Sequence, residues 1–338
     1  MVLVTGKDQR LSILHKIGIS ALQGSVLLFY FHSVGSSQRE FYPGGISCDA
    51  LRQLIEYLHD AGFSFRRLSE AYHSVPEKGN LVAVLCCDDG LASVYHEALP
   101  ILREYKVPLT VFVVGKCLDN RAMAWNHKLI QICRHASEEQ LLPYLQKVCN
   151  RYHLRAEAQL SQCLFSVPDS GKDAFCDELW EEFCPTDQSS YLAEHEPFLT
   201  LPMMRELSEA GAEFALHSHS HADFSRLDYR QMLHEIRQNR DILSDSGYKP
   251  APFFAFPYGR ECDRNLLPNL CREASIKACL GLRYRITDNR QQSPLWQRIS
   301  LEHCTIPSVK ELVLKPALRR VKDALVSPNV ISSMFRLV

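Results

Sequence analysis

The sequence lacks a charge imbalance, a long apolar run and a recognisable secretion signal. Its 338 residues include 38 basic and 39 acidic side chains, so no overall field attracts nucleic acid and no nucleic-acid partner is expected. No apolar run reaches the roughly 18 residues that a transmembrane helix needs. Charged residues interrupt the first 23 positions, which therefore do not resemble a signal peptide. We expect a cytoplasmic protein, with membrane association at the surface as the alternative.

The cysteine pattern also lacks what a disulfide-rich or zinc-finger scaffold would show. Thirteen cysteines are scattered over the chain, and no two have Cys-x-x-Cys spacing. An odd, irregularly spaced set in a long chain favours reduced thiols that pack as small apolar side chains. With 46% hydrophobic and 23% charged residues, the composition is that of a globular protein that buries a substantial core.

Three continuous apolar runs, at residues 25–32, 81–87 and 109–114, predict strands that are buried on both faces. Segments at 49–61 and 94–105 lie between these runs and predict helices. Strands that alternate with helices through short links are typical of parallel strands joined by crossover helices. The first third of the chain therefore predicts an α/β fold.

The segment at about 116–199 interrupts this alternation, because it is polar and rich in predicted helix. We interpret it as a helical insertion or cap. The alternation then resumes with predicted helices at 202–210 and 229–244, and with predicted strands at 213–217, 252–256, 277–280 and 298–301. A total of about seven strands is typical of a (β/α) barrel that is closed, distorted or incomplete.

We expect one catalytic domain at residues 25–305, preceded by an N-terminal helical segment at 1–24 and followed by a basic helical tail at 306–338. Both end segments carry apolar residues at helical spacing. Docking onto the domain is the simpler interpretation of both, and peripheral membrane contact through the termini is the alternative. The sequence leaves the oligomeric state open.

Polar side chains stand at the ends of three predicted strands. Asp88 and Asp89 directly follow the second apolar run, and His217 and Tyr258 stand at the ends of two later strands. Chemistry in a (β/α) barrel lies at the carboxyl ends of the strands, so we expect these side chains to meet. Gly90 releases the chain into a turn, which lets one carboxylate bind a cation while the other serves as general base. A helix N-cap is the alternative for the pair.

His217 and His221 are spaced so that a tight loop or a helical turn aims both imidazoles at one metal ion. A lone histidine is usually a satisfied polar side chain, but this pair at a strand end favours metal ligation. One aspartate with two histidines leaves coordination positions open, as in catalytic zinc sites. Zinc is the preferred divalent metal, with cobalt and iron as alternatives. Cys86 and Cys87 stand beside this site and could serve as soft metal ligands instead. Packing within a buried strand is the simpler interpretation of both.

Two sequence blocks resemble the polysaccharide deacetylase family, the NodB-homology group of carbohydrate esterases. Residues 85–115 contain Asp-Asp-Gly, the following helix and the next strand, and residues 201–259 contain His-Ser-His-Ser-His and Phe-Pro-Tyr-Gly. The resemblance covers about residues 25–305 and is weakest over the insertion. It implies a hydrolase that holds a divalent metal.

The resemblance also implies a role for each matching residue. Asp88 is the general base, and His303 is the best match to the histidine that protonates the leaving amine. The implied metal ligands are Asp89, His217 and His221. The residues implied to line the substrate groove are Pro257, Tyr258 and Gly259. Within that groove the backbone N–H of Tyr258 would help to hold the oxyanion.

Several positions depart from the usual pattern of the family. Cys86 and Cys87 replace a usual Thr-Phe pair, and Ala222 stands where a proline commonly follows the second histidine. Phe256 stands where many members have an arginine that orients the base. The residues implied as metal ligands are all present. The departure at Phe256 leaves open how the carboxylate of Asp88 is oriented and how its pKa is set.

The implied reaction is the metal-dependent removal of an N-acetyl or similar N-acyl group from a carbohydrate or glycolipid. The missing export signal favours a cytoplasmic sugar, glycolipid or nucleotide-linked substrate. Two alternatives are a catalytically impaired pseudoenzyme that binds a glycan, and a C–N hydrolase that acts on a non-sugar amide. A metal site with open positions favours catalysis over binding alone.

Overall fold

The computed structural model describes residues 18–35, 41–74, 76–77, 79–154, 164–283 and 293–304, together with positions 311, 313 and 315. Most of the predicted N-terminal segment and of the predicted basic tail lies outside these residues. Within the described ranges, no helix combines the length and apolar character needed to cross a membrane.

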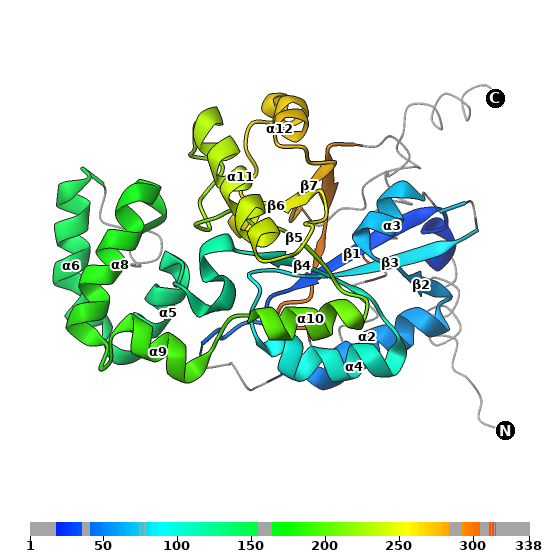
Figure 1. Cartoon of the computed structure of the whole chain (residues 1–338), viewed down its shortest axis with the longest axis horizontal. Helices are drawn as coiled ribbons and strands as arrows, with labels where there is room; N and C mark the ends of the chain where they lie inside the picture. The colour runs from blue at the N-terminus through cyan, green and yellow to red at the C-terminus, as the bar shows by residue number, and fades with distance from the viewer. Residues whose placement is uncertain are drawn as a thin grey trace, which may run out of the picture.

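A sheet of nine parallel strands forms the centre of the described structure (Figure 1). The strands are β1 (Ser25–Phe31), β2 (Phe63–Phe65), β3 (Leu81–Cys87), β4 (Leu109–Val113), β5 (Glu213–Leu216), β6 (Phe253–Ala255), β7 (Ala278–Gly281), β8 (Leu295–Gln297) and β9 (Ile299–Ser300). Their order is β8-β7-β6-β5-β4-β3-β1-β9, with β2 beside β3. This confirms the predicted distorted (β/α) barrel, with more strands than the sequence indicated.

The sheet nearly closes through the segment that carries β8 and β9. β8 pairs with β7 at one end of the strand order, and β9 pairs with β1 at the other end. Only Arg298 separates the two strands in sequence, and its N–H donates to the carbonyl oxygen of Gly281. The predicted last strand at 298–301 corresponds to β9, and β8 was not predicted. This crossing between the two edges of the sheet places Arg298 in the barrel interior.

Both faces of the central strands are buried. The side chains of β1 that join the cluster inside the barrel are Val26, Leu28 and Tyr30. Those that pack outward against the surrounding helices are Leu27, Phe29 and Phe31. Burial on both sides explains why the sequence shows continuous apolar runs instead of alternating polar and apolar residues.

Among the helices with described bounds, the following five contribute to the outer apolar layer: α2 (Cys48–Asp60), α4 (Leu99–Tyr105), α10 (Leu201–Glu209), α11 (Tyr229–Asp245) and α12 (Leu267–Glu273). α3 (Leu68–His73) packs against the inner cluster. The helix predicted at 94–105 is split into a π-helical turn, η1 (Val94–Ala98), and α4. Pro100 lacks an N–H and cannot donate to the preceding turn, which accounts for the break in regular helix.

The segment predicted as an insertion is helical, as expected. After the 3-10 turn η2 (Gly115–Asn120) it forms α5 (Trp125–His135), α6 (Glu138–Arg151), α8 (Asp169–Phe183) and α9 (Gln188–His195). These helices make a lobe beside the barrel, at left in Figure 1. The lobe buries its own apolar cluster, which includes Ile132, Phe175 and Trp180. Shorter 3-10 turns, η3 (Pro257–Gly259) and η4 (Arg264–Leu266), follow β6.

Candidate active site

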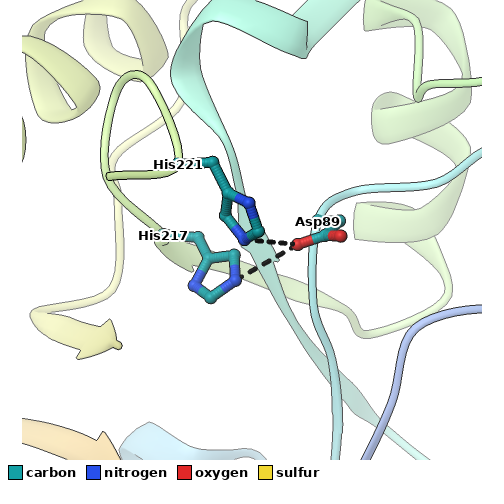
Figure 2. Close-up of side chains that lie close together, drawn as sticks. All are labelled: Asp89, His217 and His221. Carbon is teal, nitrogen blue, oxygen red and sulfur yellow. Dashed lines mark ion pairs between the residues drawn. The ribbon is translucent and has the colours of Figure 1, made fainter. Parts of the chain in front are cut away.

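Three side chains with metal-ligand atoms meet at the carboxyl ends of β3 and β5. Oδ1 of Asp89 lies 3.2 Å from Nε2 of His217 and 3.2 Å from Nε2 of His221 (Figure 2). The three side chains are at most 3% exposed. One ligand atom from each lies within 4.8 Å of the others, which is close enough for one ion. The structure thus brings together the three residues that the sequence predicted as ligands.

The loop that carries the two histidines is held by α11. Glu235 accepts the N–H groups of His219 and Ser220 at 2.9 and 2.8 Å, and the hydroxyl of Ser220 at 2.8 Å. Oδ1 of Asn239 accepts the N–H of His217 at 2.8 Å. These bonds from a single helix hold the loop after β5 in one conformation.

The backbone at the site is locally strained. Four non-glycine residues there have left-handed backbone angles, with φ between 58° and 66°: Asp89, Ser218, His221 and Tyr258. Such conformations cost about 1 kcal/mol or more each and persist only where surrounding contacts enforce them. All four residues lie at the metal-ligand cluster. This indicates that the surrounding contacts hold their side chains in the positions that the site needs.

Each of the two histidines offers an unprotonated Nε2. Nδ1 of His217 lies 2.9 Å from the carbonyl oxygen of Ala255, and Nδ1 of His221 lies 3.0 Å from Oδ1 of Asn126. Because these oxygens only accept hydrogen bonds, each Nδ1 carries the proton and each Nε2 keeps its lone pair. Burial lowers the pKa of His221 to about 4, so this ring is neutral at pH 7.

The residues of this cluster fit a divalent metal ion. Within the described ranges, Oδ1 of Asp89 and Nε2 of His221 are buried without a hydrogen-bond partner. Burial favours the neutral form of Asp89, but its contacts with the surrounding imidazoles, among them the Nε2–H of His127, hold its pKa well below the usual range. One carboxylate oxygen and two imidazole nitrogens are ligands that zinc and related ions prefer. A metal would satisfy the buried atoms that lack partners.

The second oxygen of Asp89 is held from the insertion. Oδ2 lies 3.0 Å from Nε2 of His127, a residue of α5 whose side chain is 0% exposed. The next residue towards the N-terminus, Asn126, is the one that accepts the proton of His221. Two adjacent residues of the insertion therefore contact two of the three candidate ligands.

Asp88 is paired with an arginine that the sequence analysis did not assign. The guanidinium of Arg298 donates to both carboxylate oxygens, at 2.6 and 2.8 Å, and lies 4.7 Å from the ring centroid of Tyr30. Burial alone would raise the pKa of Asp88, but the charge of Arg298 outweighs it and the pKa lies below its ordinary value. Asp88 is therefore an ionised, oriented carboxylate beside the metal-ligand cluster.

A partly buried histidine follows β1. Nδ1 of His32 lies 2.8 Å from Oε1 of Glu302, which also accepts the backbone N–H of His32 at 2.8 Å. Burial opposes protonation of His32, but Glu302 and the charges of Asp88 and Asp89 raise its pKa to about 9. His32 is therefore an imidazolium at neutral pH. The predicted acid, His303, follows Glu302 directly, but its side chain is exposed.

The predicted groove residues form η3, directly after β6. The ring of Tyr258 lies 4.5 Å from that of His221, and its hydroxyl lies 3.4 Å from Oδ1 of Asn126. The rings of Phe165 and Trp125, at 5.0 and 5.7 Å, complete an aromatic group around Tyr258. Gly259 has φ +64°, and a Cβ there would lie 2.6 Å from Leu282, so the turn requires glycine.

The sequence profile described as polysaccharide deacetylase matches residues 76–162 and 184–274, which together make up more than half of the chain. The chain belongs to the polysaccharide deacetylase family. The resemblance inferred from the sequence motifs is thereby confirmed. The matched ranges contain Asp88, Asp89 and both histidines of the cluster, whereas His32 and Arg298 lie outside them. No curated protein matches the sequence.

Solved structures with this fold differ widely from the chain in sequence. The Streptococcus pyogenes deacetylase PplD in complex with acetate is 16% identical, with a TM-score of 0.54 over 87% of this chain and 99% of that chain. IcaB from Ammonifex degensii is 17% identical, with a TM-score of 0.53 over 87% and 97%. BC0361, a polysaccharide deacetylase from Bacillus cereus, is 12% identical, with a TM-score of 0.53 over 86% and 69%. At these identities the likeness shows the fold alone.

Asp88 has an arginine partner although Phe256 stands where many family members have an arginine. Arg298 makes the contact to Asp88 from the segment between β8 and β9, so an arginine is present but comes from another part of the barrel. Phe256 is instead fully buried in the outer apolar layer.

Sequence reasoning missed five residues at the site. Asn126, His127 and Arg298 contact predicted residues, and His32 and Glu302 contact each other. His32 directly follows the first apolar strand, so the strand-end rule that identified Asp88 would also have found it. Arg298 was assigned to a strand without a role. Asn126 and His127 do not stand at the end of a strand, so this rule could not have identified them. Their position directly after Trp125 is the one feature that distinguishes them in the sequence.

Proposed function

We propose that this protein is a metal-dependent hydrolase that removes an N-acetyl or similar N-acyl group from a carbohydrate or glycolipid. The observation that carries the proposal is the buried Asp89–His217–His221 cluster, with its unprotonated nitrogens, next to an ionised carboxylate held by Arg298. Membership of the polysaccharide deacetylase family supports the acyl group and the sugar.

Oδ1 of Asp89 and the Nε2 atoms of His217 and His221 would hold the metal, and zinc is the ion we propose. When bound, zinc would polarise the acyl carbonyl and lower the pKa of water at the site to about 7. The three protein ligands leave positions open for water and substrate, as catalytic sites do.

Asp88 would act as the general base. Its low pKa keeps it deprotonated at neutral pH, and the two hydrogen bonds from Arg298 fix the carboxylate plane. It would accept the proton of the attacking water as the carbon–oxygen bond forms. The backbone N–H of Tyr258, at the turn after β6, is proposed to hold the developing oxyanion.

His32 would supply the proton to the leaving amine. With a pKa of about 9 it is protonated at neutral pH, and Glu302 fixes its ring through Nδ1. Transfer of this proton as the carbon–nitrogen bond breaks would release the free amine. His303 stays the acid predicted from the sequence, but its exposed side chain supports the role less than the ring of His32 does, which is 18% exposed and oriented by Glu302.

The aromatic surroundings support a sugar over a non-sugar amide. Tyr258 and Phe165 are only partly buried beside the cluster, and Tyr42 stacks on His32 with ring centroids 5.0 Å apart. Aromatic faces beside convergent polar groups suit a ring that has both an apolar face and hydroxyls. Pro257 and Gly259 would line the same groove. The buried free thiols favour a reducing, cytoplasmic location for the reaction.

Acetate release from a panel of N-acetylated substrates tests the proposal. The panel contains N-acetylglucosamine oligomers, a nucleotide-linked N-acetyl sugar, an N-acetylated glycolipid and simple aryl acetamides. We expect acetate from one of the sugars in the presence of zinc, loss of activity with a chelator and recovery when zinc is added back. Glycan binding without turnover would favour the pseudoenzyme, and turnover of aryl acetamides alone would favour a non-sugar amide hydrolase.

A further inference from the structure

The first turn of α5 reaches the metal-ligand cluster from the insertion. Asn126 and His127 are neighbours in this turn, and each contacts one candidate ligand. α5 is anchored separately to the rest of its lobe, because Nζ of Lys128 lies 3.1 Å from Asp173 and 2.7 Å from Asp177 on α8. The insertion thus presents two adjacent polar side chains to the end of the barrel.

Asn126 sets the orientation of His221. Its Oδ1 accepts the Nδ1–H of His221 at 3.0 Å and lies 3.4 Å from the hydroxyl of Tyr258. The contact keeps Nε2 of His221 unprotonated and directed at Oδ1 of Asp89. An aliphatic side chain at position 126 would leave the Nδ1–H of His221 without this acceptor and remove the preference for one tautomer.

His127 sets the orientation of Asp89. Its Nε2–H donates to Oδ2 at 3.0 Å, which leaves Oδ1 facing the two histidines. The ring is fully buried and stacked on Phe41, with ring centroids 5.3 Å apart, and it meets the ring of Phe198 edge-on at 5.2 Å. Packed in this way, His127 offers its donor in one direction.

The third candidate ligand is oriented by the barrel. Nδ1 of His217 donates to the carbonyl oxygen of Ala255, the last residue of β6. The barrel therefore supplies all three ligands but orients only one of them, and the insertion orients the other two.

We propose that Asn126 and His127 are positioning residues for the metal, so that the insertion completes the metal site and does not merely cover it. The inference rests on the proposed metal-dependent function. Partners that hydrogen-bond to ligands fix their direction and basicity, and their loss typically lowers metal affinity by about 10- to 100-fold.

The test is the zinc dissociation constant of the full-length protein, measured by competition with a chromophoric chelator. Asn126→Leu and His127→Phe remove the hydrogen bonds, and Lys128→Met is the matched control on the same helix. We expect about 10- to 100-fold weaker zinc binding in the first two variants and wild-type affinity in the control. The visible spectrum of the cobalt-substituted protein should change in the same two variants.

Conservative variants separate positioning from a general effect on folding. Asn126→Asp keeps an oxygen acceptor, and His127→Gln keeps an amide N–H donor where the imidazole Nε2 stood. We expect both to recover zinc affinity relative to Asn126→Leu and His127→Phe. Circular dichroism and thermal unfolding without metal establish that each variant is folded before its affinity is compared.

Two results would overturn the inference while leaving the proposed function intact. One is wild-type zinc affinity in both Asn126→Leu and His127→Phe. The other is an equal loss in Lys128→Met, because loosening of α5 would then account for the effect. A wild-type protein that binds no zinc would instead contradict the proposed function, and this inference with it.

Discussion

The barrel and the helical insertion contribute to the site in different ways. The loops that follow β3 and β5 carry Asp88, Asp89 and the two histidines, which are the groups that bind or react in our proposal. The insertion has its own apolar cluster and contributes Asn126 and His127, which contact the ligands without reaching the reaction themselves.

In our proposal, the barrel supplies the metal ligands and the reacting groups, whereas the insertion sets the orientation of two of the ligands. Parallel strands place the reacting groups at one end of the barrel, and this placement does not depend on the conformation of loops elsewhere. The orienting contacts, in contrast, depend on how a second apolar cluster docks against that end. Substitution of the reacting residue Asp88 should therefore lower turnover while metal stays bound, whereas substitution of Asn126 or His127 should weaken metal binding first.

Asp88→Asn is expected to separate the two properties most strongly. The amide cannot accept a proton, so kcat should fall by about 100- to 10,000-fold. Zinc content should stay at the wild-type level, because Asp88 is not among the three candidate ligands. Asp187→Asn, at the N-cap of α9, is the matched control and should change neither quantity, since asparagine caps helices as well as aspartate. Full activity in Asp88→Asn would contradict the assignment of the base.

Arg298→Met should have the next largest effect. It leaves the carboxylate of Asp88 buried without its partner, which typically costs about 3–5 kcal/mol of stability. In the wild type the lowered pKa of Asp88 stabilises the fold at pH values above the ordinary aspartate range, and this contribution is lost as pH falls through the folded-state pKa. Without Arg298, burial raises the pKa, so the acidic limb of kcat/KM should move to higher pH.

Urea unfolding at pH 7 and a pH profile of kcat/KM measure the two effects of Arg298→Met. Arg272→Met is the exposed control, and its stability should stay within about 1 kcal/mol of the wild type. An acidic limb that does not move would show that Arg298 does not tune Asp88.

His32→Gln should have the smallest of the three effects, a fall in kcat of about 100-fold. The raised pKa of His32 means that the acid form is present at neutral pH and is lost as pH rises through about 9. The wild-type kcat should therefore decline above that pH, and the decline should be absent in His32→Gln. His303→Gln is the matched control and should keep the wild-type profile. The reverse pattern would support His303 as the acid.

The fold was predictable where burial leaves a strong pattern. Strands β1, β3 and β4 are covered on both faces, so their sequences are continuous apolar runs. β8 has only three residues and follows Pro294, so it lacks the length that such a pattern needs. The helices of the insertion could be expected as a group, but their bounds depend on a cluster formed within the lobe.

The site was predictable to the extent that its residues stand at strand ends in the sequence. Asp88, Asp89 and His217 meet this rule, and His32 meets it as well but has no neighbouring motif to draw attention to it. Arg298 reaches Asp88 across 210 positions of sequence, through the closure of the barrel. Contacts of this kind follow from tertiary packing and leave no local pattern.

Elemental analysis of the purified protein measures whether Asp89, His217 and His221 hold a metal ion. Wild type and Asp88→Asn should each contain about one zinc or related ion per chain, whereas Asp89→Ala and His217→Ala should contain none. A wild-type protein without metal after supplementation, or metal retained in Asp89→Ala and His217→Ala, would contradict the proposed metal site.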